Sequence, residues 1–195
     1  LDGSSSESSE IIVFPPSIAL SAISGELKNT EYKVGIQNIH HEENGAYTGE
    51  ISAEMVKSLD VQYAIIGHSE RRQYFFETDT QINGKIKNAF KADLCPVVCV
   101  GESLHERESG KTNEILKKQL MSAFKDIDNT SDRIVVAYEP VWAIGTGKSA
   151  DSNLVYDAHN FINEILQNLF ENHAPILYGG SVKSENASEL YQIKN

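Results

Sequence analysis

The sequence is poor in cysteine, and the two cysteines that it has cannot pair. They are Cys95 and Cys99, four residues apart in one apolar run. In an extended strand their Cα atoms would lie roughly 13 Å apart, whereas a disulfide requires less than about 7 Å. No Cys-x-x-Cys motif occurs, so zinc and redox roles have little support. Free thiols fit a reducing, intracellular compartment.

Positive charge and long apolar runs are also scarce. Lys and Arg number 17 against 28 Asp and Glu, which gives a net charge of −11. A negative field repels nucleic acids and anionic membranes, and no apolar run is long enough to cross a bilayer. We therefore expect no nucleic-acid partner and no membrane partner. The net charge does not exclude a small anionic substrate, because backbone N–H groups or a Lys can act locally.

The composition is that of a folded protein with a core. Hydrophobic residues make up 40% and charged residues 23% of the 195 residues. These shares are ordinary for globular proteins and allow one domain or two small ones. Short apolar runs rich in Val, Ile, Tyr and Phe recur, largely continuous, as strands buried on both faces require. They cover 11–14, 32–36, 61–66, 95–100, 134–138 and 175–178.

Helical periodicity fills much of the chain between these runs. Apolar residues recur at helical spacing over 51–59, 82–90, 115–127 and 154–169. Thr78 and Gln81 have the spacing of a capping box at the start of the second helix. Strands that alternate with helices predict parallel pairing through right-handed crossovers.

Two α/β architectures satisfy this pattern: an open doubly wound sheet and a closed (β/α)8 barrel. No Gly-x-Gly-x-x-Gly motif follows the first run, which weakens the dinucleotide-binding version of the open sheet. Glycine and polar residues cluster directly after strand ends, where the active sites of barrels lie. The pattern therefore favours the barrel. These clusters are Gly67-His68, Gly101-Glu102, Glu139-Pro140 and Gly179-Gly180.

Two of these strand ends carry candidate catalytic residues. His68 precedes a segment that we expect to form a helical turn, whose N–H groups disfavour a charged imidazole. A neutral imidazole can polarise a carbonyl, although a surface or capping histidine is the plain alternative. Glu139 directly follows a buried run. Apolar cover would make it a stronger base, whereas most Glu residues are simply exposed.

Two further segments suggest a lid and an anion site. Residues 142–148 begin with bulky apolar side chains and end with glycines. They predict a lid in which Gly145 bends while Ile144 covers the site, unless Ile144 merely packs. Gly179, Gly180 and Ser181 follow the last run. Their backbone can approach a ligand and form an anion nest, although a simple turn has the same residues.

Three motifs together resemble the triosephosphate isomerase family. They are Gly-His-Ser-Glu-Arg-Arg at 67–72, Tyr-Glu-Pro-Val-Trp-Ala-Ile-Gly-Thr-Gly at 138–147 and Tyr-Gly-Gly-Ser-Val at 178–182. Residues 45–50 and 99–102 also look like that family, so the likeness runs through nearly the whole chain. The resemblance implies one TIM barrel domain over residues 1–195.

The resemblance also implies a reaction. Members of that family interconvert dihydroxyacetone phosphate and D-glyceraldehyde 3-phosphate through an enediolate in glycolysis and gluconeogenesis. By resemblance, Glu139 moves a proton between the two carbons, the role long assigned in this family. Neutral His68 polarises the carbonyl and shuttles protons between the two oxygens of the enediolate. The backbone N–H groups of Gly145 and Ser181 bind the phosphate. Gly180 and Ile144 line the substrate site, and Ser69 and Glu70 support it.

The remaining implications concern partners. The family is a cytoplasmic homodimer, and the resemblance implies that the loop Gln37–Thr48 enters the partner subunit while Glu50 pairs with Arg71. No metal ion and no organic cofactor is implied, because proton transfer between carbons requires only a base, an electrophile and a dry site.

The resemblance breaks at both ends of the chain. The family opens with a strand carrying an Asn and a Lys that hold the substrate, and closes with an eighth strand carrying two glycines; neither is found here. We therefore expect six of eight strands, exposed sheet edges and near inactivity of the 195 residues alone. A catalytically silent dimer-forming module and a different phosphate-binding barrel enzyme are the alternatives.

Overall fold

A single sheet organises the molecule. The computed structural model describes residues 9–128, 133–143 and 151–193. Every strand runs parallel to its neighbours and pairs with the strand that precedes it in the chain. All six predicted strands are confirmed within their predicted bounds. They are β1 (Ile12–Val13), β2 (Lys33–Ile36), β3 (Tyr63–Ile66), β4 (Cys95–Val100), β5 (Val135–Tyr138) and β6 (Ile176–Tyr178).

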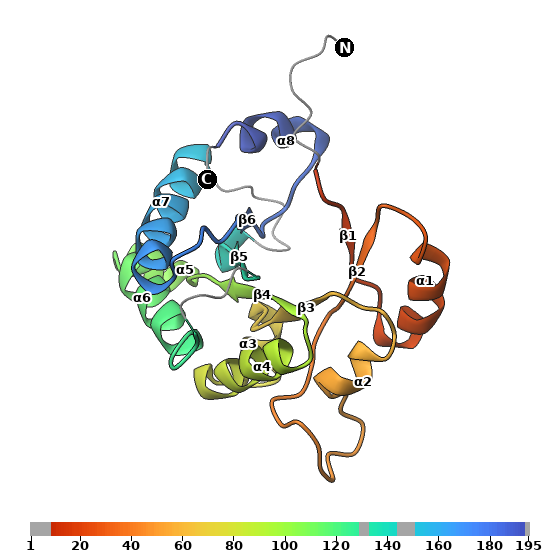
Figure 1. Cartoon of the computed structure of the whole chain (residues 1–195). Helices are drawn as coiled ribbons and strands as arrows, with labels where there is room; N and C mark the ends of the chain where they lie inside the picture. Colours follow the sequence, from red (N-terminus) through yellow and green to blue (C-terminus); the bar gives the residue numbers. More distant parts are fainter. Residues whose placement is uncertain (1–8, 129–132, 144–150, 194–195) are drawn as a thin grey trace.

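The strand order decides between the two predicted architectures. The order is β1-β2-β3-β4-β5-β6, whereas a doubly wound sheet reverses its order at a switch point. Figure 1 shows the helices on the outside of the curved sheet. The fold is therefore that of a TIM barrel, of which the described residues supply six strands.

Four helices lie where the apolar periodicity predicts them. These are α2 (Ala53–Lys57), α4 (Asp79–Lys91), α6 (Thr112–Ala123) and α7 (Ser152–Leu169). The capping box of α4 is confirmed, because the Thr78 side chain accepts from the Gln81 N–H and the Gln81 side chain accepts from the Thr78 N–H.

The apolar periodicity of the sequence does not predict the remaining helices. Each of these elements spans about two turns or fewer, which is too short for a clear apolar repeat; α2 is also short, but the repeat around it continues over 51–59. Only α3 was anticipated, as a helical turn after His68. The short elements are α1 (Leu20–Leu27), α3 (Ser69–Tyr74), α5 (Leu104–Glu108), α8 (Ser184–Tyr191) and the 3-10 turns η1 (Ser17–Ala19) and η2 (Val141–Ala143).

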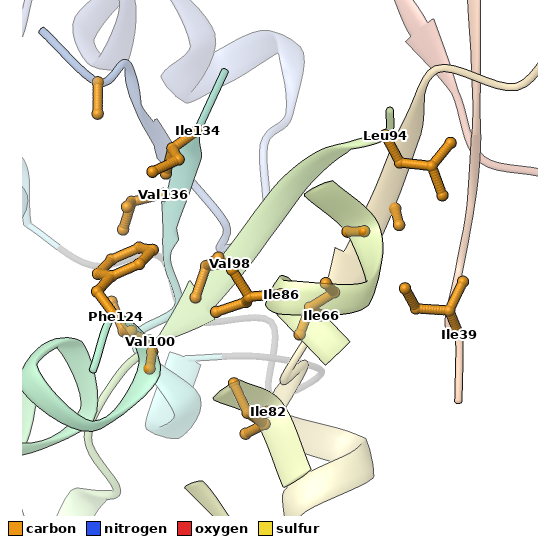
Figure 2. Packing of buried hydrophobic residues seen from close by; sticks show 14 of the residues in the cluster. Ile39, Ile66, Ile82, Ile86, Leu94, Val98, Val100, Phe124, Ile134 and Val136 are labelled. Atoms are coloured by element: carbon orange, nitrogen blue, oxygen red, sulfur yellow. The ribbon is translucent and has the colours of Figure 1, made fainter. Parts of the chain in front are cut away.

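The main core fills the space between the sheet and the outer helices. Ile66, Val98 and Val136 point outward from three strands and are fully buried. Ile82 and Ile86 of α4 belong to the same cluster, and Figure 2 shows these side chains between the ribbons. Complete burial of each such side chain contributes about 1.5–3 kcal/mol, so this layer holds the strands in place.

The alternate residues of the same strands form the inner layer. Val97 and Cys99 of β4 pack with Ala137 of β5 in a second buried cluster. The alternation of a strand places residues two positions further on the same face. Gly101 and Glu139 therefore follow on the inner face, at the carboxyl ends of β4 and β5.

One buried polar side chain in the core has no hydrogen-bond partner among the described residues. His159 of α7 is 4% exposed, and both of its ring nitrogens are unpaired there. Its ring packs edge-on against Tyr138, with the ring centroids 6.0 Å apart. Burial lowers the pKa of His159 from its ordinary value of 6.5 to about 4. The imidazole is therefore uncharged in the folded protein at neutral pH.

We predict that His159 makes the fold sensitive to acid. Between pH 6.5 and about 4, the unfolded chain protonates this side chain and the folded chain does not. The free energy of unfolding should therefore fall as the pH drops through this window, by about 3 kcal/mol from this group. Urea unfolding of the parent and of His159→Leu across the window measures the difference. His173→Leu, at an exposed position, is the control, and equal pH slopes for parent and His159→Leu would contradict the prediction.

Candidate active site

The two candidate catalytic side chains meet at the carboxyl ends of the strands. His68 follows β3 and Glu139 follows β5. The Nε2 atom of His68 lies 3.2 Å from Oε1 of Glu139. The structure thus brings together two residues from distant parts of the chain, in the region where barrel enzymes hold their catalytic groups.

The imidazole of His68 is oriented by the helix that follows it. His68 is the N-cap of α3, and its Nδ1 atom accepts a hydrogen bond from the N–H of Glu70 at 3.3 Å. A nitrogen that accepts carries no proton, so the single proton of a neutral ring lies on Nε2. The proton-bearing nitrogen therefore faces Glu139. The carboxylate of Glu70 is largely exposed, 3.9 Å from Nδ1.

Glu139 is a buried carboxylate with hydrogen-bond donors around it. The residue is 4% exposed. Its Oε2 atom accepts from the N–H of Ser69 at 2.9 Å, and its Oε1 atom lies 3.2 Å from Nε2 of His68. Burial and then the negative charge of Glu139 raise the pKa of Cys99, so the thiol keeps its proton at neutral pH. These donors offset the cost of burying a charge.

The predicted anion-binding segment lies beside Glu139. The Gly179 N–H donates to the Tyr138 carbonyl at 2.7 Å, which joins the end of β6 to the end of β5. Within the described residues, the N–H groups of Gly180 and Ser181 donate to no other residue. They are therefore available to an anion, although phosphate binding stays a prediction. Ile144 and Gly145 lie outside the described residues, so their positions at the site stay predictions too.

A buried carboxylate holds the first residues of the predicted lid. Glu102, fully buried, accepts hydrogen bonds from Trp142 Nε1 at 3.0 Å and from Arg107 Nη1 at 2.7 Å. The Tyr138 hydroxyl lies 3.1 Å from both of its oxygens. Burial and then the charge of Glu102 raise the pKa of Tyr138, so this hydroxyl stays a donor. No local pattern in the sequence pointed to this role of Glu102, because its partners Tyr138 and Trp142 lie 36 and 40 residues further along the chain.

The expected ion pair between Glu50 and Arg71 is replaced by two others in the described residues. Arg71 pairs with Glu77, and Glu50 lies 3.3 Å from His40. Glu77 also binds the ammonium of Lys85, a buried residue. Glu77, in the segment that follows α3, therefore has two cationic partners, Arg71 of α3 and Lys85 of α4. No local pattern in the sequence pointed to Glu77.

Further buried contacts tie this cluster to the loop. Burial acts to raise the pKa of Glu77, but the hydrogen bonds from Lys85 and Arg71 outweigh it and the pKa is lowered. Lys85 Nζ also donates to Asn38 Oδ1 at 2.6 Å. The cluster therefore connects α3 and α4 to the base of the loop Gln37–Thr48.

A cavity borders His68. Its volume is about 600 Å³, within the range of small-molecule sites. It extends from His68 to the base of the loop Gln37–Thr48, and Glu139 does not line it. Its walls include Phe14, Gln37, Asn38, Glu50, Ile65, His68, Glu70, Arg71 and Phe75.

We predict that Glu102 is indispensable to the local structure around Trp142. Glu102→Leu removes the acceptor of three buried or partly buried donors and should cost about 3 kcal/mol or more in unfolding free energy. Trp142 is the sole tryptophan, so its fluorescence emission should also shift. Glu108→Leu, at an exposed position of α5, is the control. Unchanged stability and emission in Glu102→Leu would refute the prediction.

Comparisons with known proteins agree with this geometry. The family profile described as triosephosphate isomerase matches residues 2–195. The triosephosphate isomerase of Alkaliphilus oremlandii is 48% identical over 186 residues, which cover 93% of this chain and 75% of that protein. That of Dictyoglomus thermophilum is 46% identical over 189 residues, covering 94% of this chain and 76% of that protein.

A comparison with solved structures also finds a triosephosphate isomerase. The crystal structure of triosephosphate isomerase from Bartonella henselae matches with a TM-score of 0.87 and 38% identity, over 94% of this chain and 76% of that one. The chain spans about three quarters of the length of these relatives. With the strand order and the meeting of His68 and Glu139, these matches show that the chain belongs to the triosephosphate isomerase family.

Proposed function

We propose that this chain, as one barrel domain over residues 1–195, interconverts dihydroxyacetone phosphate and D-glyceraldehyde 3-phosphate. The observation that carries the proposal is the distance of 3.2 Å between His68 Nε2 and the buried carboxylate of Glu139. This pair offers a base and a hydrogen-bond donor on the same side of a barrel, which is what proton transfer next to a carbonyl requires.

The proton is moved by Glu139. Its carboxylate removes a proton from the carbon next to the substrate carbonyl, and the electron pair flows into an enediolate. His68 moves the hydroxyl proton from one oxygen of the enediolate to the other. The same carboxylic acid returns the carbon-bound proton to the neighbouring carbon, so nothing is oxidised or reduced overall. In the described arrangement the two carboxylate oxygens are engaged by Ser69 and His68. At least one of these contacts must open before the carboxylate reaches a carbon.

The electrophile is the Nε2–H of His68. Because Nδ1 is held by the N–H of Glu70, the ring presents its proton toward the site and can donate it as a hydrogen bond to the carbonyl oxygen. The donor stabilises the charge that develops on that oxygen. Ser69 and Glu70 support the arrangement, Ser69 through its contact with Glu139 and Glu70 through its contact with the ring.

The phosphate of the substrate would be bound by backbone N–H groups. The N–H groups of Gly180 and Ser181 have no partner among the described residues, which supports this assignment. By family resemblance Gly145 joins them while Ile144 covers the site. Among the described residues that line the cavity beside His68 there is no Lys, and the Arg that lines it, Arg71, already pairs with Glu77. Since positive charge assists the binding of a dianion, we expect weak binding and low turnover by the 195 residues on their own.

We predict that two conservative changes separate catalysis from folding. Glu139→Asp withdraws the carboxylate by one methylene, and His68→Gln replaces the imidazole; each should lower kcat roughly 100-fold while the unfolding midpoint changes little. The assay follows both directions of the reaction with the chain alone and with the chain fused to the unmatched end segments of the Alkaliphilus oremlandii relative. Glu114→Asp and His105→Gln, at exposed positions, are matched controls.

Three outcomes would count against the proposal. Unchanged turnover in Glu139→Asp or His68→Gln would show that the assigned roles are wrong. Triose phosphate binding with no turnover even in the fused chain would indicate a catalytically silent module. Turnover of a different phosphorylated sugar in preference to the trioses would indicate another barrel enzyme.

We further propose that the chain forms a homodimer through the loop Gln37–Thr48. Exposed aromatic side chains support a partner on this side of the molecule: Phe75 lines the cavity that reaches the loop, and Phe76 is 81% exposed with a left-handed φ of 54°. A bulky residue in that conformation, placed in water, is unusual. Tyr47, near the end of the loop, is 44% exposed.

We predict that sedimentation velocity will find a species of twice the chain mass of 21.6 kDa. The double change Phe75→Ser and Phe76→Ser should shift it to the monomer, because it removes apolar area from the proposed interface. Tyr191→Ser is the control, since Tyr191 is an equally exposed aromatic residue on α8. A parent chain that sediments as a monomer at all concentrations would disprove the dimer.

The setting of the reaction is part of the proposal. We propose a cytoplasmic role in glycolysis and gluconeogenesis, without metal or cofactor. Cys95 and Cys99 form no disulfide in the described residues, which fits a reducing compartment. In the described residues, no helix combines the length and the apolar character needed to cross a bilayer.

A further inference from the structure

Glu139 lies between two glycines at the same level of the sheet. In the register of the sheet Cys99 is opposite Ala137, and Ala137 is opposite Leu177. Two residues further along each strand, Gly101 and Gly179 therefore flank Glu139. The ladder continues this far, because the Glu139 N–H donates to the Val100 carbonyl at 2.7 Å and the Gly179 N–H donates to the Tyr138 carbonyl.

Neither flanking position can hold a side chain without moving Glu139. A Cβ atom on Gly101 would lie 1.7 Å from the carbonyl oxygen of Glu139. A Cβ atom on Gly179 would lie 2.8 Å from Glu139 Cγ. The first distance involves backbone, which cannot rotate away. The position of the carboxylate-bearing residue is thus set by how closely the backbone of Gly101 approaches it.

The backbone of Gly101 is in turn held by one side chain. Gln119 Oε1 accepts from the Gly101 N–H at 2.8 Å, and Gln119 Nε2 donates to the Gly101 carbonyl at 3.0 Å. Gln119 belongs to α6, on the outer side of the sheet, and is partly buried. Without this amide, the N–H and the carbonyl of Gly101 would each lose a hydrogen-bond partner just after the end of β4. The two bonds fix the distance and the orientation of Gly101 relative to α6.

We propose that Gln119 is a positioning residue for Glu139. Its amide fixes the Gly101 backbone against α6, and the Gly101 backbone fixes Glu139 relative to Ser69 and His68. Gln119 touches no reacting atom, so its effect on the reaction passes through Gly101. The inference rests on the proposed function only where it concerns catalysis; the placement of Glu139 can be tested without turnover.

The test compares Gln119→Met with Gln167→Met. Met has nearly the length of Gln but cannot form the two hydrogen bonds, and Gln167 is an exposed residue of α7. The first readout is the Ser69 amide resonance in a ¹H–¹⁵N spectrum of the 195-residue chain, because this N–H donates to Glu139 Oε2. Glu139→Gln provides the reference for a changed contact. We expect the Ser69 resonance to shift in Gln119→Met and to stay unchanged in Gln167→Met.

The second readout is the split between kcat and KM. Displacement of the base should lower kcat roughly tenfold in Gln119→Met, with KM within about twofold, because the phosphate-binding N–H groups lie on another strand end. Gln119→Glu keeps the acceptor for the Gly101 N–H but places a second acceptor against the Gly101 carbonyl, so it too should shift the Ser69 resonance and lower kcat. Should Gln119→Met not fold, Gln119→Glu against Gln167→Glu carries the comparison.

The outcomes separate the two proposals. If Gln119→Met moves the Gly101 amide resonance but leaves Ser69 at its parental position, Gln119 has only a structural role and the inference is overturned. If the parent chain has no turnover even when fused to the relative's end segments, the proposed function fails, and the Ser69 resonance alone decides the positioning role. A Ser69 shift together with a tenfold loss confined to kcat supports both.

Discussion

The site depends on the burial of one negative charge. The carboxylate of Glu139 is almost completely removed from water, and a charge in that position is tolerated only where donors surround it. Those donors are the N–H of Ser69 and Nε2 of His68, which follow β3, whereas Glu139 itself follows β5. The ends of β3 and β5 are therefore connected by the same group that we propose as the base.

The orientation of His68 follows from helix physics. A helix begins with N–H groups that have no partner within it, and in α3 the imidazole supplies an acceptor for one of them. The cost of leaving that N–H unpaired then favours a ring with its proton on Nε2, which is the nitrogen that faces Glu139. The same local interaction that starts α3 thus prepares the ring to donate a hydrogen bond into the site.

Buried carboxylates recur as connectors in this acidic chain. Glu102 joins β5 and α5 to the start of the predicted lid through Tyr138, Arg107 and Trp142. Glu77 joins Arg71 of α3 to Lys85 of α4. In each case local donors surround the charge, although the net charge of the chain is −11. Breaking such a group by removing one partner costs far more than the pair adds in net stability, which makes these positions intolerant of change.

The sequence by itself determined the alternation of strands and long helices, since apolar periodicity is a local property. It also pointed to His68 and Glu139, because polar residues directly after buried runs must lie at the carboxyl edge of a parallel sheet. Only the tertiary structure decided which side chains pair across that edge. Arg71 forms its ion pair with Glu77 and not with Glu50. Gln119 is hydrogen-bonded to the backbone of Gly101, which lies 18 residues earlier in the chain. Such pairs depend on distances between segments that are remote in the chain, and no periodicity within a segment encodes those distances.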